Sequence, residues 1–226
     1  MSEPEVKYGI FKTEIKNRFL CTVNVDGIDT LCYIPSSCRL SNFINMNGRG
    51  VLLLPIKKKN ARTKYSVYAI QYRRGFVPVS LSSVNQVIKN DLNRRLFSFL
   101  GSRKTVFREK YIDGYKSDLY IEDSDTVVEI KSILSFGKKA LFPTVFSERA
   151  NHQLENIMDL LMAGHKVCYM FISMYGGTKQ ITVNEEQPEY CSLFRNCIEA
   201  GMMVRGFSLY MDNGMPRVKT TVKCVF

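Results

Sequence analysis

Asp118, Glu129 and Lys131 have the residue types and the spacing of a site that acts on phosphate esters. Two carboxylates can bind Mg²⁺ or Mn²⁺, with the backbone carbonyl of Ile130 as a possible third ligand, because these hard cations take oxygen ligands. Such a metal polarises a phosphodiester and lowers the pKa of a bound water. Lys131 can orient that water or stabilise the charge that develops on the phosphate. The alternative without function is that Glu129 and Lys131 simply lie on a solvent-exposed face of a strand.

A predicted β-hairpin positions these three residues. Two runs rich in β-formers, Ser117–Glu122 and Thr126–Ile133, flank the turn sequence Asp123-Ser124-Asp125. Because side chains alternate along a strand, Glu129 and Lys131 share one face while Ile130 enters the core from the other. In a suitable register Asp118 lies beside Glu129. As a side chain that faces the site, Lys131 is expected to contribute little to packing.

The segments around this hairpin resemble a known family. Ala140–Ile172 reads ALFPTVFSERANHQLENIMDLLMAGHKVCYMFI, and Gly9–Gly27 reads GIFKTEIKNRFLCTVNVDG. Both resemble segments of the sugar fermentation stimulation protein A (SfsA) family, and the resemblance covers nearly the whole chain in order. The Asp, ten-residue gap and Glu-x-Lys also resemble the PD-(D/E)XK nuclease signature. The resemblance implies an OB-like nucleic-acid-binding domain followed by a PD-(D/E)XK nuclease-like three-layer α/β domain, in a mixed α+β fold.

The resemblance also adds site candidates and shows departures. It raises Glu148 to a candidate catalytic residue and Arg149 to a candidate nucleic-acid-binding residue, although Glu148 can simply favour the helix dipole. Asn90 stands where the family has a Glu, with Asp91 beside it, and Thr144 stands where the family has an Asp. The family's Pro-Asn-Thr-Gly turn is replaced by Pro35-Ser36-Ser37-Cys38. We interpret Asn90 as weakening the metal site on that side and Thr144 as one acid fewer, and loss of the turn's Gly restricts positive φ there.

The first third of the chain is predicted to be a small barrel. Short strands are expected at Tyr8–Ile15, Arg18–Val25, Ile28–Ile34, Gly50–Lys57, Tyr65–Tyr72 and Phe76–Ser80. Asp26-Gly27 is typical of a tight hairpin turn. Five or so strands in this length fit an OB-type barrel. We place a domain boundary near residue 80, giving an OB-like domain at 1–80 and a nuclease-like domain at 81–226.

Helices and strands alternate in the second part. The apolar pattern predicts helices over Ser83–Leu100, over about Ser147–Met162 with Ser147 as N-cap, and over Pro188–Ala200. Buried or paired strands are expected at Lys166–Ser173, Met203–Met211 and Arg217–Val225, the last two joined by Asp212-Asn213-Gly214. This order favours a mixed sheet with flanking helices.

The distribution of charge indicates which part of the chain binds a polyanion. Residues 1–80 hold thirteen Lys/Arg against five Asp/Glu, a formal charge of +8, whereas residues 81–226 carry +3. The predicted phosphate contacts are Arg18, Lys57, Lys58, Lys59, Arg62, Lys64, Arg73 and Arg74. Tyr65, Tyr68 and Tyr72 lie among them and suit either base stacking or the barrel core. The expected partner is DNA, with RNA as a second candidate, and a solubility charge is the alternative.

Other classes of function are poorly supported. Only two histidines are present, and the seven cysteines form no Cys-x-x-Cys pair, which disfavours histidine-based catalysis and a zinc site. No run of about 20 apolar residues is present to cross a membrane. We therefore expect a cytoplasmic protein with no membrane partner, either a monomer or a homodimer.

Three functional hypotheses follow from these observations. The first is a Mg²⁺- or Mn²⁺-dependent nuclease that hydrolyses DNA, and RNA as a further candidate, with non-specific binding. The second is a non-catalytic DNA-binding regulatory protein. The third, an RNA-processing or ribosome-associated OB protein, rests on charge alone. The residues Asp118, Glu129 and Lys131 discriminate between them, because a pure binder has no need of all three.

Overall fold

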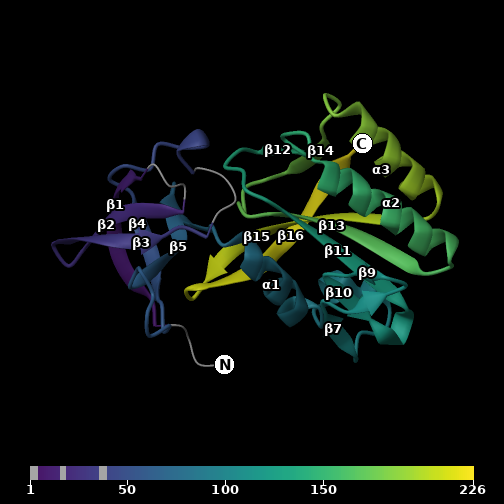
Figure 1. The fold of residues 1–226 in the computed structure, drawn as a ribbon, viewed down its shortest axis with the longest axis horizontal. Helices are drawn as coiled ribbons and strands as arrows, with labels where there is room; N and C mark the ends of the chain where they lie inside the picture. Colours follow the sequence, from purple (N-terminus) through teal and green to yellow (C-terminus); the bar gives the residue numbers. More distant parts are fainter. Residues whose placement is uncertain (1–4, 16–18, 36–39) are drawn as a thin grey trace.

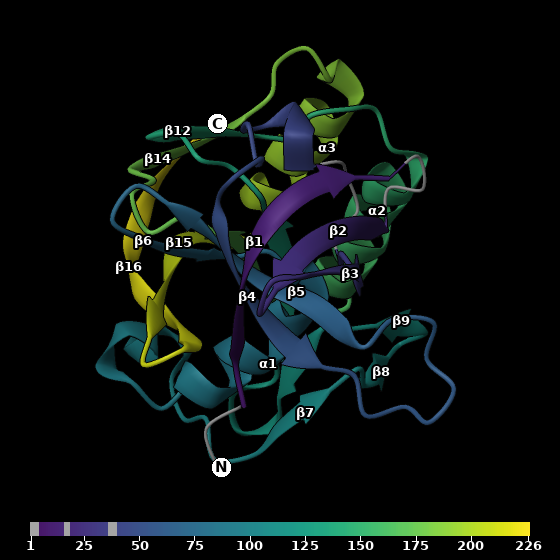
Figure 2. The same cartoon turned by 90° about the vertical axis from the view of Figure 1, so that its left-hand side faces the viewer.

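Six N-terminal strands form one sheet, five of them closed into a barrel, in the computed structural model, which describes residues 5–15, 19–35 and 40–226 (Figure 1). The strands are β1 (Lys7–Glu14), β2 (Leu20–Val25), β3 (Ile28–Tyr33), β4 (Gly50–Pro55), β5 (Tyr65–Tyr72) and β6 (Gly75–Pro78). Strands β1, β2 and β3 follow one another in antiparallel pairs, and β4 lies between β1 and β5. A parallel pairing of β3 with β5 closes the barrel over five strands. The OB-type barrel is therefore confirmed (Figure 2).

Local sequence explains two features of the barrel. The turn between β2 and β3 is Asp26-Gly27, and both residues have positive φ, at 51° and 85°. Such a turn matches the twist of paired strands, which is why Asp-Gly favours it. Gly9 lets β1 approach β2, because a Cβ there would lie 2.5 Å from the Val23 side chain.

The second part of the chain forms an eight-stranded mixed sheet. Its strands are β7 (Val106–Arg108), β10 (Leu119–Ile121), β11 (Thr126–Ile133), β12 (Lys139–Phe142), β13 (Lys166–Ser173), β14 (Gln180–Val183), β15 (Met203–Asp212) and β16 (Met215–Val225). Their order is β12-β14-β16-β15-β13-β11-β10-β7, with β11, β13 and β15 parallel. A separate two-stranded hairpin, β8 (Tyr111–Ile112) and β9 (Tyr115–Lys116), stands beside the β10 end.

Three helices make the sheet a three-layer structure. Helix α1 (Val84–Asp91) shares a core with one face of the sheet, and α2 (Glu148–Met162) and α3 (Pro188–Glu199) share a core with the other. Helix α2 begins where the Ser147 hydroxyl accepts a hydrogen bond from the Ala150 N–H at 3.2 Å, and Gly164 follows its end at φ 93°. No helix of the described residues is long and apolar enough to span a membrane.

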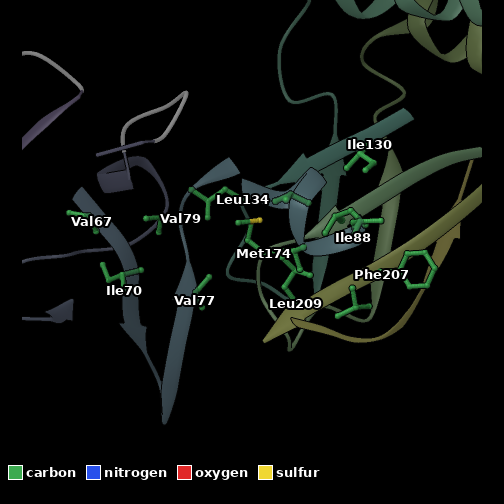
Figure 3. Close-up of a cluster of buried hydrophobic side chains, with 14 of the residues drawn as sticks. Val67, Ile70, Val77, Val79, Ile88, Ile130, Leu134, Met174, Phe207 and Leu209 are labelled. Carbon is green, nitrogen blue, oxygen red and sulfur yellow. The ribbon is translucent and has the colours of Figure 1, made fainter. Parts of the chain in front are cut away.

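One hydrophobic core joins the barrel to the second sheet (Figure 3). Val67 and Val79 come from the barrel side of residue 80, whereas Ile88, Ile130 and Phe207 come from α1, β11 and β15. Aromatic contacts cross the same junction, with Tyr72 in the barrel lying about 5 Å from Phe136 and Tyr175 between ring centroids. The two sheets are thus separate, but their packing is continuous.

The predicted helix over Ser83–Leu100 is wrong in its length. Helix α1 ends at Asp91, and a separate 3₁₀ segment covers Arg95–Leu100. The Ser83 hydroxyl does not cap it but donates to the Ser80 carbonyl at 2.7 Å. The Asp91 carboxylate is fully buried and accepts from the Val218 N–H at 2.8 Å. This contact with β16 fixes the helix end in a way that apolar spacing does not reveal.

Candidate active site

The β10–β11 hairpin brings the two predicted carboxylates together. Leu119 pairs with Val128, so the preceding residue, Asp118, falls opposite Glu129. The Asp118 Oδ2 atom accepts a hydrogen bond of 2.8 Å from the Ile130 N–H. The four residues between the strands, Glu122 to Asp125, form the turn that supplies this register. The hairpin and the adjacency of Asp118 and Glu129 are present as the sequence predicts.

Glu129 is a buried carboxylate with a donor on each oxygen. Its side chain is 3% exposed. Its Oε1 atom accepts from Lys131 Nζ at 2.7 Å and from Gln153 Nε2 at 3.2 Å. Its Oε2 atom accepts a short hydrogen bond from the Tyr115 hydroxyl. A buried charge needs such partners, because desolvation without them is costly. The site is therefore pre-organised around Glu129.

Lys131 is more enclosed than the sequence suggests. Its side chain is 12% exposed, and besides Glu129 its ammonium donates to the Gln153 Oε1 atom. The Tyr169 ring lies 5.7 Å from Nζ. The expectation that Lys131 contributes little to packing is wrong, because its ammonium neutralises a buried carboxylate. Two of the three ammonium donors are thus engaged within the site, and the third is left for another acceptor.

In the Asp118–Glu129 pair, Asp118 is the carboxyl whose pKa is raised. Burial, followed by the negative charge of Glu129, raises the pKa of Asp118, and hydrogen bonds from Ile130 and Asn85 act in the opposite direction. The Asn85 contact is 2.7 Å long and comes from α1. Two adjacent carboxylates with one ammonium leave an excess of negative charge. A cation offsets such an excess.

A cleft of about 460 Å³ opens over the carboxylates. Residues from β9, β11, α2 and the loops next to β8, β9 and β10 line it: Glu109, Gly114, Tyr115, Lys116, Ser117, Asp118, Glu129, Arg149, His152, Gln153 and Asn156. Arg149 therefore lies at the cleft, and its contact with nucleic acid stays a prediction. Glu148 is exposed in the first turn of α2 and does not line the cleft. Of the two residues that the resemblance adds, the structure brings only Arg149 to the carboxylates.

A histidine fastens the hairpin that carries Tyr115. His165 Nε2 lies 2.9 Å from Asp113 Oδ2 in the β8–β9 turn, and Nδ1 lies 3.1 Å from Asp125 Oδ2 in the β10–β11 turn. The hydrogen bond to Asp113, followed by that to Asp125, raises the pKa of His165 against the opposing effect of burial. The β8–β9 strands pair only with each other, so this link helps to hold one wall of the cleft.

The donor set can accept a divalent metal only with help from water or the main chain. Within the described residues, no group of three or more His, Cys, Asp or Glu side chains is placed to hold a metal ion. Asp118 and Glu129 supply two carboxylates. Both Asp118 oxygens and Glu129 Oε2 accept one hydrogen bond each and keep a second lone pair, whereas Glu129 Oε1 already accepts two. Mg²⁺ and Mn²⁺ suit such a site, because Mg²⁺ usually keeps several waters and needs only one or two carboxylates. The Ile130 carbonyl as a third ligand stays a prediction.

The position that bears on Asp118 from α1 is Asn85 and not Asn90. Asn90 accepts from Gln86 Nε2 at 2.7 Å, and both line another cavity. The neighbouring Asp91 pairs with Arg94 at 2.9 Å and with Arg217 at 2.8 Å. The interpretation that Asn90 weakens the metal site is therefore wrong in its geometry. Thr144 is exposed and does not line the cleft.

The predicted phosphate contacts are exposed on the barrel. These are Lys57, Lys58, Lys59, Arg62, Lys64, Arg73 and Arg74, and none of them pairs with a carboxylate of a described residue. Arg18 lies outside the described residues. Tyr68 is buried, and Tyr65 and Tyr72 pack against the core. These contacts favour the core role of the three tyrosines over base stacking.

Sequence reasoning missed three supporting residues: Tyr115, Gln153 and Asn85. Gln153 was detectable, because it follows Arg149 by one helical turn and Asn156 completes the same polar face. Tyr115 lies on a two-residue strand whose sequence carries no periodic signal. Asn85 lies on α1, where the apolar residues indicate which face enters the core but give no sign of what a polar side chain contacts.

The fold and the site together define a two-domain class, an OB barrel joined to a mixed α/β domain with paired carboxylates and a lysine. Residues 82–215 match the family described as "Sugar fermentation stimulation protein RE domain", and residues 15–79 match "SfsA N-terminal OB domain". The chain therefore belongs to the sugar fermentation stimulation protein family, SfsA.

Individual relatives agree with this assignment. A sugar fermentation stimulation protein homolog of Caldanaerobacter subterraneus is 24% identical over 92% of this chain and 93% of its own length. A homolog of Sulfolobus acidocaldarius is 26% identical over 86% of this chain and 81% of its own. The solved structure of Pyrococcus furiosus SfsA in complex with Ca²⁺ matches with a TM-score of 0.82 at 19% identity, covering 100% of this chain and 98% of that one. The likeness of the two structures confirms the fold.

Proposed function

We propose that the chain is a nuclease that hydrolyses phosphodiester bonds of DNA, and RNA as a further candidate, with Mg²⁺ or Mn²⁺ at Asp118 and Glu129. The observation that carries the proposal is the Asp118–Glu129 carboxylate pair, which lines a polar cleft, with the Lys131 ammonium 2.7 Å from Glu129 behind it. A surface that only binds nucleic acid gains nothing from burying two carboxylates. The printed description of the Pyrococcus furiosus relative, a complex with Ca²⁺, supports binding of a divalent ion.

The charge balance of the cleft supports a divalent cation. Asp118 and Glu129 face one ammonium, and the raised pKa of Asp118 reflects the remaining repulsion and the burial. A bound divalent ion supplies a Lewis acid for the phosphate and an acidified water. The chain's own residues do the rest. Tyr115 and Gln153 fix the Glu129 carboxylate, and Lys131 is the cation that can stabilise a phosphate that has entered the cleft.

Positive side chains give the substrate a path to the cleft. Arg149 lines the cleft, and Lys57, Lys58 and Lys59 lie in the loop between β4 and β5. This loop and the β8–β9 hairpin lie far apart along the long axis in Figure 1, but on the same side of the molecule in Figure 2. A nucleic acid that lies along this side can contact both. Phosphate contacts of this kind position the strand without reading its sequence.

A cleavage assay tests the proposal. Labelled single- and double-stranded DNA and RNA are incubated with Mg²⁺, Mn²⁺ or EDTA, and binding is measured in parallel. We expect cleavage that needs the metal, and Glu129→Gln should bind but not cleave. Glu122→Gln, an exposed carboxylate of the same hairpin that pairs with Lys110, is the matched control and should keep its activity.

The competing function is nucleic-acid binding without catalysis, which the basic barrel alone can support. Binding of DNA or RNA with no cleavage under any divalent ion would favour that function. Cleavage that survives in both Asp118→Asn and Glu129→Gln would place the active site elsewhere in the chain.

A further inference from the structure

A second cavity lies where the barrel, α1 and the C-terminal hairpin meet. It measures about 500 Å³, within the range of about 300–1,000 Å³ typical of small-molecule sites. Tyr68 reaches it from β5, Gln86 and Asn90 from α1, and Met215 and Arg217 from the β15–β16 hairpin. It shares no lining residue with the carboxylate cleft. The junction of two domains is a common place for a ligand site.

The charge beside this cavity favours an anion. Asp91 is fully buried and supplies one negative charge, whereas Arg94 and Arg217 both pair with it. The cluster therefore keeps one uncompensated positive charge. The pair with Arg217 joins Nε to Asp91 Oδ1 at 2.8 Å, and the two Nη atoms of Arg217 donate to no other described residue. Arg217 lines the cavity, so its outer guanidinium edge is available to a phosphate.

The polar groups beside Arg217 suit the edge of a purine. Gln86 is committed, because its Oε1 atom accepts from Arg108 at 2.7 Å and its Nε2 atom donates to Asn90 Oδ1 at 2.7 Å. That arrangement orients the Asn90 amide and leaves its Nδ2 without a partner among the described residues. Asn90 Oδ1 keeps one lone pair beyond the bond from Gln86, so the amide still offers an acceptor beside its Nδ2 donor, the side-chain pattern that recognises adenine.

Apolar groups complete the cavity. Tyr68, Val87, Met215 and Pro216 give it walls that fit a flat ring. The Tyr68 side chain is 9% exposed, and its hydroxyl has no partner among the described residues. An aromatic body, a polar edge and an anionic group together describe a nucleotide.

We propose that this cavity is a second ligand site, for a nucleoside monophosphate unit with adenine as the favoured base. The Arg217 guanidinium holds the phosphate, and the Asn90 amide meets the base edge. The ligand bridges the barrel and α1. Because Asn85 on the same helix contacts Asp118, the ligand also stiffens the element that supports the carboxylate cleft. The proposal does not depend on nuclease activity.

Calorimetric titration of the full chain in EDTA tests the proposal, with adenosine 5′-monophosphate, adenosine and ribose 5-phosphate as probes. The monophosphate should bind at least about tenfold more tightly than either half, since each half loses one set of contacts. Asn90→Ala should weaken the monophosphate but leave ribose 5-phosphate unchanged. Arg217→Ala should weaken the monophosphate by about 10–100-fold but leave adenosine unchanged.

Two exposed residues of α3 provide the matched control. Arg195→Ala and Asn196→Ala remove the same side-chain types at another place and should leave the affinity for the monophosphate unchanged. Asn90 is exposed, so its variant should fold even if Arg217→Ala disturbs Asp91. Absence of saturable binding in the wild-type chain, or equal affinity in the wild type, Asn90→Ala and Arg217→Ala, would overturn the proposal.

A competition arm distinguishes the source of the ligand. A single-stranded oligoadenylate that displaces the monophosphate, and does so poorly in Asn90→Ala, identifies an unpaired nucleotide of a strand as the occupant. An oligoadenylate that binds without displacing the monophosphate identifies the free nucleotide. Either outcome identifies the cavity as a site for a nucleoside monophosphate unit.

Discussion

Replacing Lys131 with Met tests whether its ammonium holds the site together. The substitution keeps most of the aliphatic stem and removes the charge that lies 2.7 Å from Glu129 Oε1. Glu129 is 3% exposed, so its carboxylate depends on protein donors more than on water. Removing one partner of a buried ion pair typically costs about 3–5 kcal/mol. The donors Tyr115 and Gln153 remain, and each contributes about 1 kcal/mol to holding the carboxylate.

We therefore expect Lys131→Met to lower the free energy of unfolding by roughly 2–4 kcal/mol in EDTA. For a chain of this size the melting temperature should fall by roughly 5–15 °C. Circular dichroism during heating and urea titration measures both quantities. Cleavage by the metal-bound protein should fall by about 10²–10³-fold, the usual effect of losing one electrostatic stabiliser.

Two further variants make the Lys131 test decisive. Lys116→Met removes an exposed lysine that pairs with Glu109 at 2.6 Å, and it should change stability by less than about 0.5 kcal/mol. The double variant Lys131→Met with Glu129→Gln should recover most of the loss, because it leaves no unpaired buried charge. If Lys131→Met is as stable as Lys116→Met, the buried-pair argument is refuted.

Three further predictions follow from the same structure. Asp118→Asn should raise the melting temperature in EDTA at pH 7, because the raised pKa of Asp118 makes its ionised form costly in the folded protein. The gain should vanish below about pH 3.9, where the carboxyl is protonated in both the folded and the unfolded chain, and a lower melting temperature at pH 7 would contradict this. His165→Gln should destabilise the chain at pH 6 but hardly at pH 9. The raised pKa of His165 adds stability that is complete below about pH 6.5 and is lost as pH rises through the pKa of the folded state. Equal urea midpoints of variant and wild type at pH 6 would argue against the His165 link. Replacing Lys57, Lys58 and Lys59 with Gln should lower the slope of log affinity for duplex DNA against log salt by up to about 2.7, and an unchanged slope would exclude these lysines as phosphate contacts.

The sequence predicted those parts of the fold that periodic patterns specify. The barrel strands, the β10–β11 hairpin and α2 follow from alternation, from Asp-Gly and from the Ser147 cap, which act within a few residues. The short strands β12 and β14 were missed, because four residues carry too little alternation to separate from a loop. The early end of α1 was also missed, because it depends on a contact between Asp91 and Val218, which are 127 residues apart.

The candidate site divides in the same way. Asp118, Glu129 and Lys131 lie on one hairpin, so local register was enough to bring them together. Gln153 and Tyr115 approach the same carboxylate from α2 and from the β8–β9 hairpin. Their positions depend on how separate elements pack, which spacing within one element does not encode. The degree of burial of Lys131 has the same origin, since Gln153 covers it from another element.

Helix α1 shows why a substitution must be judged by its face and not by its place in a motif. Successive helical residues are about 100° apart, so Asn85 and Asn90 point about 140° away from each other. Asn85 meets Asp118, whereas Asn90 meets Gln86 on the wall of the second cavity. An acid at position 90 would therefore add no ligand to the carboxylate cleft. The Asn found there instead leaves the second cavity without an added negative charge next to Arg217, which is the condition that an anionic ligand needs.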